Sequence, residues 1–177
     1  MMNKHRINQT LGAWAMTLGA LLLFTGCAGY RLGTMLPGDI KTVFVPTFVN
    51  QTAEPLLEVD TTQAMIRELQ RDGSLKVVRT EAEADAVLHV VLKGFTLDPV
   101  AFRSDIRSAA QEYRMIIDAS MVMRRTTDQS VVVESPLIRG DYVFDVVGDL
   151  SSSKLLALPD ASDDLARRLV QRVVEYW

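Results

Sequence analysis

The spacing of apolar and polar residues predicts alternating strands and helices from residue 40 onward. Residues 40–46 (IKTVFVP) are rich in β-branched and aromatic residues and predict a short first strand. Residues 54–72 change to helical spacing and are followed by Gly73, a typical helix stop. The expected apolar stripe of this helix consists of Val59, Thr62, Met65, Ile66 and Leu69. Residues 74–79 then predict a brief strand, and residues 80–84 predict a turn.

Three longer segments predict the main sheet. In residues 85–97 the even positions are apolar and the odd positions are mixed; the even ones are Ala86, Leu88, Val90 and Leu92, and the odd ones are Val87, His89, Val91, Lys93 and Phe95. Residues 111–125 alternate more clearly, with an apolar face made of Tyr113, Met115, Ile117, Ala119, Met121 and Met123. Because successive strand side chains point to opposite faces, the other face of this segment is largely polar. Residues 130–146 predict a further antiparallel strand, broken or bulged near Pro136.

The chain ends in a predicted helix. Asp160, Asp163 and Asp164 are expected in its first turn, where acidic groups favour the positive end of the helix dipole. Its expected apolar stripe is Ala166, Leu169, Val170, Val173 and Trp177. Residues 151–158 fit either a helix or a loop. Helices with one apolar stripe and strands with one apolar face predict an α+β fold. In it, two helices pack on one face of a mostly antiparallel four- or five-stranded sheet, as a two-layer sandwich.

The N-terminal segment is typical of a secretory signal peptide. A basic start precedes an apolar run, residues 11–24, that is shorter than the roughly 20 residues a membrane-spanning helix needs. The run ends at Gly26 and Cys27, the only cysteine, in a sequence that resembles the lipobox of bacterial lipoproteins. That resemblance implies cleavage between these two residues and a diacylglyceryl and an N-acyl group on Cys27, which anchor stably. An ordinary leader would instead leave a free thiol, a liability in an oxidising compartment.

These features divide the chain into three parts. Residues 1–26 are the expected lipoprotein signal peptide, residues 27–36 a lipidated tether, and residues 37–177 a single domain. Removing the leader takes away two basic residues and no acidic residue, so the formal charge changes from −3 to −5. This acidic balance disfavours a nucleic-acid-binding protein, which needs a concentrated basic face. Ala28 stands where, by resemblance to enterobacterial lipoproteins, an aspartate would retain the protein at the inner membrane, so we expect the outer membrane.

The sequence offers no recognisable catalytic or metal-binding pattern. His89 lies in mid-strand without a nucleophile or an orienting acid at a recognisable spacing, and we interpret it as a sheet-face residue with a satisfied hydrogen bond. Glu81, Glu83 and Asp85 lack the spaced oxygen ligands and the glycine of a calcium loop, which favours a solvated turn. We therefore expect no enzyme, no metal site, and no cofactor apart from the lipid on Cys27.

Several short motifs follow one another along the mature chain. They are CAGYRL at residues 27–32, VPxFxNxT at residues 45–52, ADAVL at residues 84–88 and EYR at residues 112–114. In this order they resemble the LPS-assembly lipoprotein family (LptE-like), with an extra Ala28 as a departure. The resemblance implies a two-helix, four-stranded domain that sits as a plug inside the outer-membrane β-barrel LptD. It also implies a role in inserting lipopolysaccharide into the outer leaflet.

Arginines are the expected contacts to lipopolysaccharide, because guanidinium groups form paired hydrogen bonds with the phosphates of lipid A. The candidates are Arg124 and Arg125 at a strand end, and Arg103 and Arg107 in the loop after Pro99. If the two strands form a hairpin, the first pair lies at the opposite end from the second, so the four arginines cannot form one patch. These arginines could equally be solvated or pair with barrel carboxylates. A competing function is a periplasmic accessory lipoprotein, either an ABC-transporter component or a secretin pilotin. A lipid-anchored hydrolase would need a nucleophile and a base that this sequence does not display.

Overall fold

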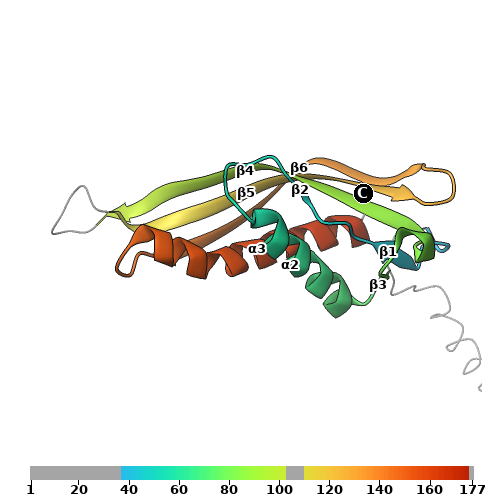
Figure 1. Ribbon diagram of the computed structural model, residues 1–177, viewed down its shortest axis with the longest axis horizontal. Helices are drawn as coiled ribbons and strands as arrows, with labels where there is room; N and C mark the ends of the chain where they lie inside the picture. The colour runs from blue at the N-terminus through green and yellow to red at the C-terminus, as the bar shows by residue number, and fades with distance from the viewer. Residues whose placement is uncertain (1–36, 103–109, 176–177) are drawn as a thin grey trace, which may run out of the picture. The chain divides into compact units, whose positions relative to one another are not determined.

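The computed structural model describes residues 37–102 and 110–175 (Figure 1). Its elements, in chain order, are β1 (Thr42–Phe44), β2 (Val49–Asn50), α2 (Leu57–Asp72), β3 (Lys76–Val77), a 3₁₀ turn η1 (Glu81–Glu83), β4 (Ala86–Phe102), β5 (Ala110–Arg125), β6 (Val131–Asp145) and α3 (Leu150–Val174). The expected signal peptide and tether, with Gly26 and Cys27, lie outside the described residues. The candidate contacts Arg103 and Arg107 also lie outside them.

The sheet has six strands and is mixed, so the expectation of four or five mostly antiparallel strands is corrected. Strand order is β3-β1-β4-β5-β6, with β2 also paired to β4. The long strands β4, β5 and β6 are antiparallel, whereas β1 is parallel to both β3 and β4, and β2 is parallel to β4. A parallel pair needs a crossover connection, and α2 provides it between β1 and β3. The sequence predicted β1 and β3 as short strands, and the strand it missed is β2, whose two residues are too few to show any alternation.

Helices α2 and α3 cover one face of this sheet, and the core lies between the two layers (Figure 1). The predicted apolar faces of the two central strands are confirmed. In β4 the buried residues on that face are Ala86, Leu88, Val90 and Leu92, and in β5 they are Met115, Ile117, Ala119, Met121 and Met123. The α+β class and the packing of two helices against one sheet face therefore follow from the alternation in the sequence.

A bulge in β4 changes which side chains face the helices. Leu92 pairs with Ala119 and Gly94 pairs with Asp118, so Lys93 is an extra residue. Beyond the bulge, Phe95 pairs with the core residue on the neighbouring strand and packs partly buried against the core. The expectation that Phe95 shares the mixed outer face was wrong, because alternation cannot be extended through a bulge.

Helix α2 ends where the sequence predicts. Gly73 has φ 77°, and its N–H donates to the carbonyl of Leu69 at 3.0 Å. A left-handed residue at this position closes the helix at little cost only if it is glycine. The apolar stripe was predicted less well: Met65 and Leu69 are buried, but Val59 is 42% exposed.

Helix α3 begins at Leu150, ten residues before the predicted start, which makes residues 151–158 helical. Asp149 is the N-cap, and its side chain accepts a hydrogen bond from the N–H of Ser152 at 2.9 Å. Pro159 lies inside the helix. The later start was predicted because the acidic residues at 160, 163 and 164 were assigned to a first turn.

The aspartates expected to cap α3 have another role. Asp163 and Asp164 lie in the middle of the helix and form ion pairs, so the capping interpretation was wrong. Asp163 binds Arg67 of α2 at 2.8 Å, which joins the two helices. Asp164 binds Arg167 at 3.0 Å and Arg168 at 2.8 Å along its own helix.

Candidate functional site

The structure does not bring Arg124 and Arg125 into one patch. They are consecutive in β5 and point to opposite faces of the sheet. Arg125 is ion-paired with Asp39 and lies 3.9 Å from the carboxylate of Asp128. Arg124 is exposed, and its Nη1 donates to the carbonyl of Gln129 at 3.2 Å. Of this pair, only Arg124 has no carboxylate partner among the described residues.

Asp85 holds two strands together instead of belonging to a solvated turn. Its Oδ2 accepts hydrogen bonds from the N–H of Lys41, the N–H of Thr42 and the hydroxyl of Thr42, each at 2.9 Å. These hydrogen bonds lower the pKa of the Asp85 carboxyl. Glu81 and Glu83 are exposed in η1, as the solvated-turn interpretation predicts. The aspartate of the ADAVL motif therefore fastens the start of β1 to the start of β4.

Asn50, in the VPxFxNxT motif, organises the loop before α2. Its Nδ2 donates to the carbonyl of Glu54 and to the carboxylate of Glu58, both at 2.8 Å. Its Oδ1 accepts from the N–H of Thr52 at 2.9 Å and from the hydroxyl of Thr52 at 2.7 Å. Four hydrogen bonds to one side chain explain why asparagine and threonine stand two residues apart here.

The outer face of the sheet, which the helices do not cover, carries charges paired between strands. Arg139 on β6 donates to both carboxylate oxygens of Asp118 on β5, at 2.8 and 3.1 Å. This bidentate pair raises the pKa of Arg139 above the ordinary value of an arginine. His89 is also exposed on this face, and its ring forms no hydrogen bond with another described residue. Its predicted place on a sheet face is confirmed, but the structure supplies no partner for it in the described ranges.

Helix α3 approaches the sheet closely at Gly140 of β6. A Cβ added there would lie 2.6 Å from Leu165 Cβ and 2.7 Å from both Leu165 Cα and Leu165 N. One residue further, the N–H of Asp141 donates to Asp164 Oδ2 at 3.0 Å. The helix therefore supplies a hydrogen-bond acceptor to β6, which is an edge strand of the sheet formed by the described residues.

Asp164 and Arg168 extend this contact into a small network. Burial raises the pKa of Asp164, but hydrogen bonds from the N–H of Asp141 and from Arg168 and Arg167 outweigh it, and the pKa is lowered. Arg168 also donates to Asp141 Oδ1 at 3.0 Å. These charge-assisted bonds hold α3 beside β6.

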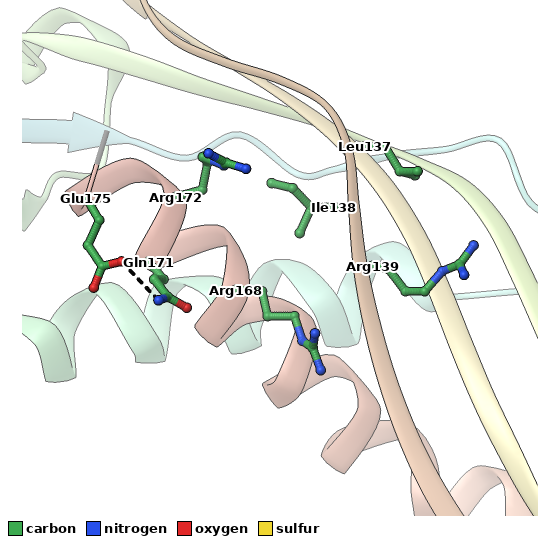
Figure 2. Close-up of a pocket in the computed structure, with 7 residues that line it drawn as sticks. All are labelled: Leu137, Ile138, Arg139, Arg168, Gln171, Arg172 and Glu175. Carbon is green, nitrogen blue, oxygen red and sulfur yellow. Dashed lines mark hydrogen bonds between the residues drawn. The ribbon is translucent and has the colours of Figure 1, made fainter. Parts of the chain in front are cut away.

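A hollow of about 420 Å³ opens between β6 and the last turns of α3 (Figure 2). It is lined by residues 137–139 of the strand and by Arg168, Gln171, Arg172 and Glu175 of the helix. We call it the arginine hollow, because Arg139, Arg168 and Arg172 all line it. Sequence reasoning missed it, and the only signal was the four-residue spacing of Arg168 and Arg172, which places them on one side of a helix.

Neither a metal cluster nor a membrane-spanning helix occurs among the described residues. Within residues 37–102 and 110–175, no group of three or more His, Cys, Asp or Glu side chains is arranged to hold a metal ion. Over the same ranges, no helix combines the length and the hydropathy required to cross a bilayer.

The fold and the surface define a two-layer α+β domain with ion-paired strands and a cationic hollow. Solved structures share this fold. A protein of Xanthomonas campestris is 13% identical with a TM-score of 0.56, and the match covers 78% of this chain and 88% of that one. A hypothetical protein of Chlamydia trachomatis is 11% identical with a TM-score of 0.53, over 76% of this chain and 95% of that one. At these identities the likeness shows the fold alone. A comparison with curated proteins found no match.

The sequence also matches a family model. That model, LptE, described as lipopolysaccharide-assembly, covers residues 40–173. The chain therefore belongs to the LptE family. The match spans every described element from β1 to β6 and most of α3, including Asn50, Asp85 and the strand and helix that form the arginine hollow. The resemblance drawn from the short motifs is confirmed.

Proposed function

We propose that this protein is an outer-membrane lipoprotein that acts as plug and assembly partner of an LptD-type β-barrel. In this role it assists the transport of lipopolysaccharide to the outer leaflet. The observation that carries the proposal is the family match over residues 40–173. Lipidation of Cys27, expected from the lipobox-like sequence, would tether the domain to the membrane.

The outer sheet face supports the plug role. The lumen of a transport barrel is polar, so a domain lodged in it needs polar outward faces. On β5 and β6 the charged side chains Asp118 and Arg139 are paired across strands, and Arg114 lies 3.9 Å from the carboxylate of Asp141. Such pairs keep the face polar while neutralising part of its charge.

The proposed role requires binding and shape rather than bond chemistry. Lipid A phosphates would be met by guanidinium groups. Arg124 stays a candidate contact, and the prediction remains that Arg124→Glu combined with Arg125→Glu weakens lipopolysaccharide binding. Because Arg125 is already engaged by Asp39 and Asp128, we expect Arg124→Glu alone to account for most of that loss.

Affinity purification from membranes tests the partnership. The full-length chain, tagged at its C-terminus, should co-purify with a large outer-membrane β-barrel in a one-to-one ratio after mild detergent extraction. Recovery of an inner-membrane transporter or a secretin in that ratio, with no such barrel, would support the accessory-lipoprotein function and refute the plug role.

Mass spectrometry of the same material tests the anchor. We expect an N-terminal Cys27 carrying diacylglyceryl and N-acyl groups, and we expect Cys27→Ser to leave the membrane fraction. An intact leader, or an unmodified thiol on native protein, would show that the lipobox interpretation is wrong. The barrel partner is the control for the fractionation, because an integral membrane protein should stay in the membrane fraction with either variant.

A further inference from the structure

The arginine hollow contains one arginine, Arg172, that has no carboxylate partner among the described residues. Arg168 and Arg172 of the helix line it together with one carboxylate, that of Glu175. The guanidinium of Arg139 points away from the helix in Figure 2 and is paired with Asp118. Glu175 accepts a hydrogen bond from Gln171 at 2.9 Å, along the helix, as the dashed line in Figure 2 shows. The only acidic side chain of the hollow is thus partly engaged by an amide.

The three arginines differ in how many of their donors are occupied. Arg139 uses its Nε and one Nη to bind Asp118, and Arg168 uses its Nε and one Nη to bind Asp164 and Asp141. A guanidinium group has five N–H donors, so three remain on each of them. Arg172 forms no ion pair with any described residue, and its guanidinium points toward Ile138 in Figure 2.

The wall opposite the helix is apolar. Leu137 is 56% exposed, although it lines the hollow, and Ile138 beside it is buried. Leu137 belongs to the bulge that follows Pro136, where β5 and β6 lose their register between Ala119 and Met121. The bulge keeps this edge from forming a regular ladder, so an added β-strand is a poor occupant. A second copy of the chain is also disfavoured, because a symmetric contact would place arginine against arginine.

We infer that the arginine hollow binds a phosphomonoester group, with Arg172 as the principal ligand-binding side chain and Arg168 as the second. A dianionic phosphate accepts several hydrogen bonds and suits the planar donor fork of arginine. The adjacent Leu137 favours a phosphate attached to an apolar body over a free ion. This inference rests on the proposed function, in which the ligand is the phosphorylated lipid A part of lipopolysaccharide. It places the contact at a site different from Arg124.

A positive residue in the last turn of a helix also complements the helix dipole, which would give Arg172 a purely local role. A matched variant separates the two roles. Arg71 occupies the last turn of α2, is exposed, and pairs only with Glu68 of its own helix. Arg71→Glu and Arg172→Glu therefore change the net charge equally, and each places an acidic residue in the last turn of a helix. Only Arg172→Glu alters the hollow.

The test measures binding of fluorescent lipid A to the full-length chain in detergent, by displacement with unlabelled ligands. We expect Arg172→Glu and Arg172→Ala to weaken binding of doubly phosphorylated lipid A at least tenfold, and Arg71→Glu to change it less than twofold. Arg172→Lys should fall between them, because it keeps the charge and loses the fork. Lipid A stripped of both phosphates should bind the native protein and Arg172→Glu equally. Thermal unfolding of each variant checks that the fold is kept.

The possible results separate this inference from the proposed function. If the native chain binds lipid A and Arg172→Glu binds it as well as Arg71→Glu does, the hollow is not the site, and the proposed function stands. If the native chain does not bind lipid A, the lipopolysaccharide-binding role itself is wrong. If inorganic phosphate binds in an Arg172-dependent manner while lipid A does not, the hollow is a site for free phosphate, and the lipid assignment is overturned.

Discussion

Replacing Gly140 with alanine tests how closely α3 packs against the sheet. The added methyl carbon would lie 2.6 Å from Leu165 Cβ and 2.7 Å from Leu165 Cα and N. Non-bonded carbon atoms are most stable at about 3.5–4.0 Å, so the methyl group lies about 1 Å too close. Two of the three atoms belong to the helix backbone and cannot rotate away. The clash can be relieved only if α3 moves.

The expected cost can be estimated from overpacked cores. Inserting a methylene group where the surroundings are full typically costs about 1–3 kcal/mol, and a backbone obstacle favours the upper end. We therefore expect Gly140→Ala to lower the free energy of unfolding by about 3 kcal/mol. For a domain of this size 1 kcal/mol corresponds to about 2–4 °C, so the melting temperature should fall by about 6–12 °C.

Urea unfolding followed by circular dichroism measures this loss. Gly38→Ala is the matched control, because an added Cβ meets nothing within 4 Å there, and the glycine does not have a positive φ. We expect the control to stay within about 1 kcal/mol of the native protein or to be slightly more stable. The reasoning is refuted if Gly140→Ala behaves like Gly38→Ala. It is also refuted if Leu165→Ala rescues Gly140→Ala, because the three obstructing atoms remain in alanine.

Three further predictions concern contacts that the site residues make. Asp85→Asn should cost about 1–2 kcal/mol at pH 7. Hydrogen bonds lower the folded pKa of Asp85 below its ordinary 3.8, so the stability that its carboxylate adds is fully present above pH 3.8 and is lost as the pH falls through the lowered pKa. Urea unfolding of the native protein and of Asp85→Asn, repeated from pH 7 down into the acid range, should show the difference between them shrinking. Asn50→Ala should cost about 1–3 kcal/mol in the same assay, whereas the exposed Gln51→Ala should be neutral; equal effects would refute the loop network. Lys154 binds Glu54 at 2.6 Å with side chains only 23% and 11% exposed, so a double-mutant cycle should give a coupling above about 1 kcal/mol, and a value near zero would contradict it.

The parts of the fold that the sequence predicted are those with a long, regular period. The core faces of β4 and β5 run over many residues, so misassigning one residue does not change which alternate positions are assigned to the buried face. Leu88 and Met121 were assigned to the core face for this reason, and both are buried. Gly73 was predicted as a helix stop because only glycine adopts the left-handed conformation there without strain.

The parts that the sequence did not predict depend on tertiary contacts. Strand β2 has two residues and is defined only by its pairing with β4. Lys93 interrupts the alternation of β4, and no local signal marks it as the extra residue of a bulge. Helix α3 contains Pro159 and the exposed residues Leu155 and Leu156, which break the apolar period. In each case packing against a distant segment outweighs the local preference.

The arginine hollow illustrates the same point through geometry. A helix and a strand that cross at one place diverge on either side of it, and here the close approach is at Gly140 and Leu165. Arg172 lies seven residues beyond Leu165, roughly 10 Å along the helix axis, and lines the hollow between α3 and β6. Arg172 lines this space together with Arg168 because the two side chains share a helix face. A helix displaced by Gly140→Ala would therefore move both arginines relative to Leu137. Lipid A affinity should fall in that variant even where the domain remains folded.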